Sequence, residues 1–192
     1  MQMFEYIIVL ISIVIGLALT HLMQGIAGLI QHPDRSRIWW VHLVWVGYMF
    51  VNSIFWWWYE FRLQRIEAWT FSLYAFVVFY AFYIYLICAL LFPRDLEGYD
   101  GYRDYFLSRR KWFFGLLIGW GAVDLIDTAI KNTAETNYFA SLGTEYLISQ
   151  VALTLAAVVG LVSRRESVHA TIAILFLTYQ ISWVLRLFST IN

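Results

Sequence analysis

The chain has 192 residues, of which 61% are apolar, 20% aromatic and only 14% charged. About a quarter of the residues of a water-soluble protein are charged, so this composition excludes an ordinary soluble domain and predicts a protein of the lipid bilayer. Thirteen basic residues balance thirteen acidic ones, so the chain has no net positive charge that would support nucleic-acid binding. A single cysteine, Cys88, excludes an internal disulfide or a CxxC motif.

Six apolar stretches follow one another, each with the roughly 20 residues that are needed to cross a hydrocarbon core of about 30 Å. They cover residues 4–29, 38–58, 69–92, 112–130, 138–162 and 168–188. No basic segment precedes the first stretch, and its apolar run is longer than that of a signal peptide, so we expect it to remain as a helix. The predicted fold class is therefore all-α, a polytopic membrane protein in which residues 1–192 form a single domain of six transmembrane helices.

Basic residues are distributed unequally between the two sides of these spans. With the N-terminus outside, the inner loops hold nine Lys and Arg residues and the outer side holds four. Because basic residues in short loops are retained in the cytoplasm, we expect an integral protein of the plasma or inner membrane with both termini extracytoplasmic. Most of the ten tryptophans fall near the ends of the spans, where they are expected to anchor the helices at the membrane interface.

The longest loop lies between the third and fourth spans on the expected inner side. It combines charged residues with Tyr99, Tyr102, Tyr105 and Phe106, a pattern that is typical of a short amphipathic segment on a membrane surface. Two interpretations remain open for residues 94–111. They form either a solvated connector or a docking site for a cytoplasmic partner.

A few ionisable residues lie within the spans, where each costs several kcal/mol unless it is paired or hydrated. Asp124, Asp127 and Lys131 share one face of the fourth span, and we expect Asp127 and Lys131 to pair, which leaves Asp124 without a local basic partner. Glu145 of the fifth span is predicted at a similar depth, and Arg186 lies near the outer end of the sixth. We therefore expect Asp124, Asp127, Glu145 and Arg186 to converge, either as a charge-balanced structural contact or as a site that binds an ion or small solute.

Small and mildly polar residues recur every four positions along the first span, at Ser12, Gly16, Thr20, Gln24 and Gly28, with His21 beside them. Such a stripe indicates close helix packing or the lining of a polar path. In the second interpretation Ser12, Thr20, His21 and Gln24 line the path.

The third span is rich in Tyr and Phe and carries no charge, so we expect it to face lipid or a neighbouring subunit. Spans one, four, five and six carry the small and polar residues and are expected to form the packed interior. The aromatic surface of the third span favours a homo-oligomer.

The sequence favours a small channel or transporter-like protein for a cation, a proton or a small solute. One alternative is a non-transporting scaffold or effector subunit that docks a partner through residues 94–111. Another is a haem or quinone redox subunit that uses His21, His42 or His169. Motifs for nucleotide binding, nucleophilic catalysis and zinc hydrolysis are absent from the sequence, so enzymatic activity is left open, and no metal site and no cofactor is expected.

Overall fold

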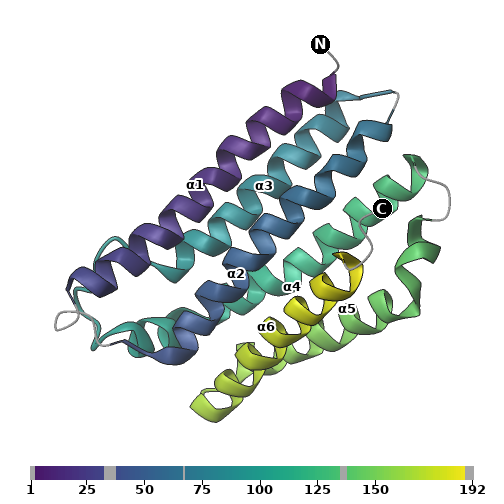
Figure 1. The fold of residues 1–192 in the computed structure, drawn as a ribbon. Helices are drawn as coiled ribbons and strands as arrows, with labels where there is room; N and C mark the ends of the chain where they lie inside the picture. The colour runs from purple at the N-terminus through teal and green to yellow at the C-terminus, as the bar shows by residue number, and fades with distance from the viewer. Residues whose placement is uncertain (1–2, 33–37, 67, 135–137, 189–192) are drawn as a thin grey trace.

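The computed structural model describes residues 3–32, 38–66, 68–134 and 138–188. Within these ranges the chain forms six long α-helices and one short 3₁₀ helix, and no strand (Figure 1). The elements are α1 (Met3–Gln31), α2 (Trp40–Tyr59), η1 (Glu60–Arg65), α3 (Phe71–Leu91), α4 (Tyr102–Ala134), α5 (Tyr138–Val162) and α6 (Glu166–Phe188). The prediction of an all-helical fold with six long helices is confirmed.

Five of these helices, α1, α3, α4, α5 and α6, are long and apolar enough to cross a membrane. The sixth, α2, has 20 residues, a length of about 30 Å, but His42, Asn52, Ser53 and its many Trp and Tyr residues make it less apolar. It packs against α1, α3 and α6 inside the bundle, where polar atoms are shielded from lipid.

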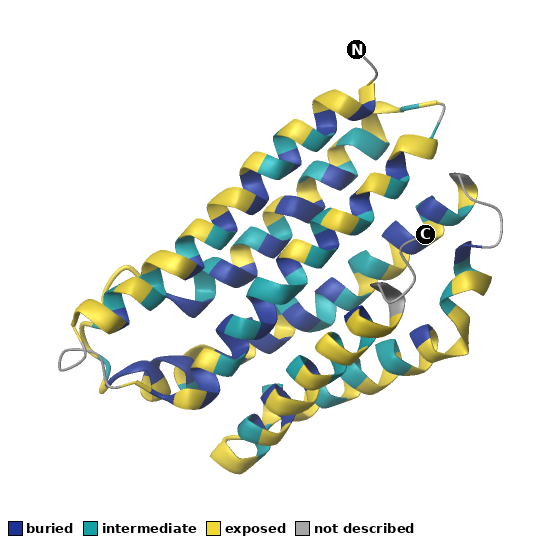
Figure 2. Cartoon of the chain, in the orientation of Figure 1, coloured by how far each residue is buried: buried dark blue, intermediate teal, exposed yellow. Residues whose placement is uncertain are grey.

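The outward faces of the helices are largely exposed (Figure 2). They carry rows of large apolar side chains. On α1 these are Tyr6, Val9, Ile13 and Leu17, and on α5 they are Leu147, Ile148, Val151, Leu155 and Val159. An apolar surface of this extent makes a protein aggregate in water. It is the surface that the acyl chains of a bilayer cover, so the molecule has the character of an integral membrane protein.

Successive helices run in opposite directions, so α6 runs back towards the end of the bundle where α1 begins (Figure 1). α1, α2 and α3 pack together, α4 lies beside α3 and α5, and α6 packs on α2 and α5. An aromatic cluster joins these parts, because Trp45 of α2 contacts Phe113 and Phe114 of α4 and Phe176 of α6 at ring-centroid distances of 4.9, 5.6 and 5.2 Å.

The third helix has one buried and one exposed face. The buried face includes Tyr80, Ala81, Ile84, Ile87 and Cys88, whereas Phe71, Phe79, Phe82 and Leu86 are exposed and available to lipid or to a neighbouring subunit. The sequence did not predict the buried face, because apolar and aromatic residues also fill the space between helices, and composition alone does not distinguish the two uses. α5, which was expected to be interior, instead exposes most of its apolar residues.

The fourth helix begins at Tyr102, ten residues before the predicted start, and includes the second half of the expected long loop. The Tyr105 hydroxyl donates to the Leu90 carbonyl at 2.8 Å, and the side chain of Phe106 is buried. Arg103 pairs with Glu166 at the start of α6. Much of segment 94–111 is thus a helical extension that is packed on the bundle, and not a separate amphipathic piece on the membrane surface.

Candidate functional site

A half-open cavity of about 160 Å³ lies between α2, α4, α5 and α6, with Tyr80 of α3 in its wall. Eleven of its 25 lining residues are aromatic, a proportion about twice that of the whole chain. The charged residues in its lining are Asp124, Asp127 and Lys131, all from one face of α4. The cavity therefore combines aromatic walls with a small number of charges from a single helix.

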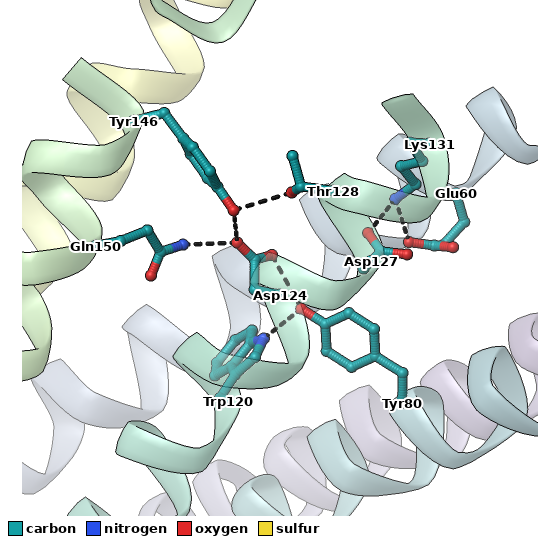
Figure 3. A network of polar contacts seen from close by, with 9 residues as sticks. All are labelled: Glu60, Tyr80, Trp120, Asp124, Asp127, Thr128, Lys131, Tyr146 and Gln150. Carbon is teal, nitrogen blue, oxygen red and sulfur yellow. Dashed lines mark hydrogen bonds and ion pairs between the residues drawn. The ribbon is translucent and has the colours of Figure 1, made fainter. Parts of the chain in front are cut away.

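Asp124 accepts hydrogen bonds from three neutral donors on two other helices (Figure 3). The Tyr80 hydroxyl of α3 donates to Oδ1 at 3.0 Å, while the Tyr146 hydroxyl and the Gln150 amide of α5 donate to Oδ2 at 2.7 and 2.6 Å. Hydrogen bonds of this kind offset part of the cost of burying a carboxylate. A carboxylate accepts about four such bonds, so Oδ1 retains capacity for a further donor or for a cation.

Both phenols that contact Asp124 are themselves hydrogen-bond acceptors. Trp120 Nε1 donates to the Tyr80 hydroxyl at 2.7 Å. Thr128 Oγ1 lies 2.9 Å from the Tyr146 hydroxyl, and because that hydroxyl donates to Asp124, Thr128 is the donor here. Each of these bonds polarises the phenol hydroxyl that donates to Asp124 and fixes the orientation of that tyrosine side chain.

The position of Tyr146 depends on a break in α5. Gly143 has φ 71° and ψ 176°, a conformation that residues with a Cβ rarely adopt, so the helix is interrupted there and restarts at Thr144. In the first turn after the break Tyr146 is buried and its neighbour Glu145 is exposed. Gln150 follows Tyr146 by four residues and lies on the same face.

A second buried cluster lies one turn further along α4. Lys131 Nζ donates to Asp127 Oδ2 at 2.5 Å and to Glu60 Oε1 of η1 at 2.7 Å. The three residues, called here the buried triad, are 3%, 3% and 0% exposed respectively. The expected pair of Asp127 with Lys131 is present, but a second carboxylate shares the same ammonium group.

The charges of the buried triad do not balance. Two carboxylates face one ammonium, and neither Glu60 Oε2 nor Asp127 Oδ1 has a hydrogen-bond partner among the described residues. Burial and the negative charge of Asp127 raise the pKa of Glu60 to about 8, although Lys131 acts in the opposite direction. With both carboxyl groups ionised, the triad thus carries one more negative charge than positive charge.

The structure does not bring the four residues of the expected cluster together. Asp124 and Asp127 both line the cavity. Glu145 and Arg186 instead form a bidentate pair between α5 and α6 at 2.6 and 2.7 Å, with about half of each side chain exposed. Because that pair is balanced and lies outside the lining, the cavity keeps an excess of negative charge.

The stripe on α1 lies away from the cavity, which has no lining residue from that helix. Thr20 and Gln24 are exposed. Ser12 donates to the Ile8 carbonyl of its own helix and accepts a bond from Trp57 Nε1 at 2.8 Å. Thr20 and Gln24 therefore face away from the core of the described chain and do not line this cavity.

The histidines of the redox alternative are engaged with backbone carbonyls. His21 and His42 donate from Nε2 to Phe92 and Leu91 at the end of α3, at 3.0 and 2.7 Å. His169 donates from Nε2 to the Ser163 carbonyl at 3.1 Å. Within the part of the chain that the structure describes, no three His, Cys, Asp or Glu side chains are arranged to hold a metal ion.

Sequence reasoning did not find Glu60, Tyr80, Tyr146 and Gln150 as parts of the site. Gln150 carried a usable signal, because a primary amide in the middle of an apolar span needs a partner. Glu60 lies just beyond α2, and its place beside Lys131, 71 residues away, depends on the path of η1. The two tyrosines had no distinguishing signal among the 13 of the chain.

Comparison with protein-family models, with curated proteins and with solved structures finds no match to this chain.

Proposed function

We propose that the protein is a small transporter-like or channel-like membrane protein that binds a small cation in the cavity beside Asp124. The observation that carries this proposal is the environment of Asp124. Its three donors are neutral, and no basic side chain in the described ranges is bonded to it. An ionised carboxylate that is held in a membrane protein without a cationic partner attracts a positive charge.

The lining of the cavity supports the binding of a cation. It is half-open, and the polar side chains of Asn52, Thr154 and Gln180 line it together with the aromatic ones. Such groups replace part of the hydration shell of an entering cation, and aromatic faces stabilise its charge. The proposal includes the predicted orientation, with both termini extracytoplasmic, and a homo-oligomer.

Flux into proteoliposomes tests the proposal, with sodium, potassium and tetramethylammonium as separate probes. Asp124→Asn keeps the size of the side chain but removes its charge, and we expect it to reduce flux of the transported probe at least about tenfold, since a buried ion contact is worth more than roughly 1.4 kcal/mol. Glu166→Gln is the matched control, because Glu166 is exposed and pairs with Arg103, and neither residue lines the cavity. Unchanged flux in Asp124→Asn, with normal assembly, would remove the site from the proposal.

A further inference from the structure

The cavity and the buried triad beside it contain more negative charge than one bound cation neutralises. Asp124, Asp127 and Glu60 are three carboxylates, and among the described residues Lys131 is the single base that is bonded to them. A monovalent cation at Asp124 leaves the buried triad with one uncompensated negative charge. Leaving such a charge buried costs several kcal/mol, so the triad requires a second positive charge.

We propose that Glu60 and Asp127 together hold one exchangeable proton beside Lys131, and that its release is coupled to cation binding at Asp124. The coupling rests on the proposed function, whereas the proton site rests on the triad alone.

The two oxygen atoms without partners define where the proton is carried. Lys131 contacts Glu60 Oε1 and Asp127 Oδ2, which leaves Glu60 Oε2 and Asp127 Oδ1 fully buried and without a hydrogen-bond partner among the described residues. A proton on either atom leaves one neutral carboxylic acid and one carboxylate that is paired with Lys131. The triad is then electrically neutral, as its burial demands.

Among the described residues, no base other than Lys131 is bonded to the triad. The titratable and charged groups around it are Asp124 from α4, Tyr59 from α2, Tyr80 from α3, Tyr138 from α5, and Arg62 from η1. The phenols are neutral near pH 7. Arg62 lies over the ring of Tyr138, with its guanidinium carbon 4.9 Å from the ring centroid, and Asp124 adds negative charge.

Coupling follows from the shared cavity. Asp127 and Asp124 lie one helical turn apart and both line it, so a cation beside Asp124 lowers the affinity of the triad for its proton by electrostatic repulsion. The O–H bond breaks, the proton passes to water in the half-open cavity, and the carboxylate remains beside Lys131. By linkage, the bound proton weakens cation binding by the same factor.

The proton itself is measured by infrared difference spectroscopy of the purified protein in an ester-free detergent, between about pH 6 and about pH 9, where ordinary carboxyl groups stay ionised. We expect the carbonyl band of one protonated carboxylic acid, which disappears as the pH rises. Glu60→Gln and Asp127→Asn should each abolish the band, because each leaves a one-to-one pair with Lys131. Glu166→Gln should retain it.

Two results overturn the proton site. One is the absence of such a band in the unmodified protein, which requires no variant to fold. The other is a band that persists in Glu60→Gln or in Asp127→Asn but is lost in Asp124→Asn, which assigns the proton to Asp124.

Coupling is measured by the binding of sodium and tetramethylammonium, followed by tryptophan fluorescence at the same two pH values. We expect affinity for the bound probe to be weaker by roughly tenfold at the lower pH, and to be independent of pH in Glu60→Gln. Equal affinity at both pH values overturns the coupling but leaves the proposed function intact. No binding at either pH, with the infrared band present, overturns the proposed function and the coupling while supporting the proton site.

Discussion

Replacement of Lys131 by Met tests whether the buried triad stabilises the fold. The substitution removes the ammonium group but keeps a flexible side chain of similar length. It breaks contacts of 2.5 and 2.7 Å and leaves two carboxyl groups in a site where all three residues are at most 3% exposed. Loss of one partner of a buried ion pair costs about 3–5 kcal/mol, which corresponds to a decrease in Tm of about 10 °C for a chain of this size.

The assay is thermal unfolding in detergent micelles, followed by the fluorescence of the ten tryptophans. The decrease in Tm should be smaller at low pH, where both carboxyl groups are protonated and no longer require the ammonium. Arg103→Met is the control, because it breaks a pair in which the side chains are 58% and 45% exposed, and its expected cost is below about 1 kcal/mol. If Lys131→Met and Arg103→Met lower the Tm equally, the reasoning about the triad is refuted.

Three further predictions use the same measurement. Tyr146→Phe removes a donor to Asp124 and should cost about 1.5–3 kcal/mol, and a cost near zero would show that this bond is not formed. Gly143→Ala forces a Cβ into a conformation at φ 71° and should cost about 1–3 kcal/mol, whereas Gly28→Ala, in a regular helix with open space beside it, should be neutral or stabilising. Because burial raises the pKa of Glu60 from 4.5 to about 8, the folded state binds this proton more tightly than the unfolded state, so stability should fall as the pH rises through that interval. That dependence should be absent in Glu60→Gln, and its persistence there would assign it to another group.

Hydropathy predicted the helices because a helix that crosses a membrane needs about 20 mainly apolar residues, and the boundaries agree within a few residues except at the start of α4. There the apolar stretch begins only at Trp112, while the helix begins at Tyr102. An amphipathic extension outside the hydrocarbon core is not apolar enough to be found in this way. Hydropathy therefore locates the lipid-embedded part of a helix and not its full length.

The candidate site was predictable only where sequence spacing fixes geometry. Asp127 and Lys131 lie four residues apart, so any regular helix brings them together. The position of Glu145 along the predicted span indicated its depth. It did not indicate the face of the helix on which Glu145 lies. The break at Gly143 and the packing of α4 against α5 set the rotation of that helix, and they direct Tyr146, rather than Glu145, towards Asp124. Rotation about a helix axis depends on contacts that no single sequence displays.

The solitary thiol of the chain has a practical consequence. Cys88 is fully buried, with its sulfur 3.7 Å from Ser53 Oγ, so it is shielded from water-soluble maleimides in the folded protein. Site-directed labelling can therefore use the unmodified protein, without first removing its native cysteine. A new cysteine at Gln31, exposed at the end of α1, or at Gln64, exposed in η1, becomes the one accessible thiol of the described chain. Labelling each from outside intact cells then reports which end of the helix bundle faces the cytoplasm.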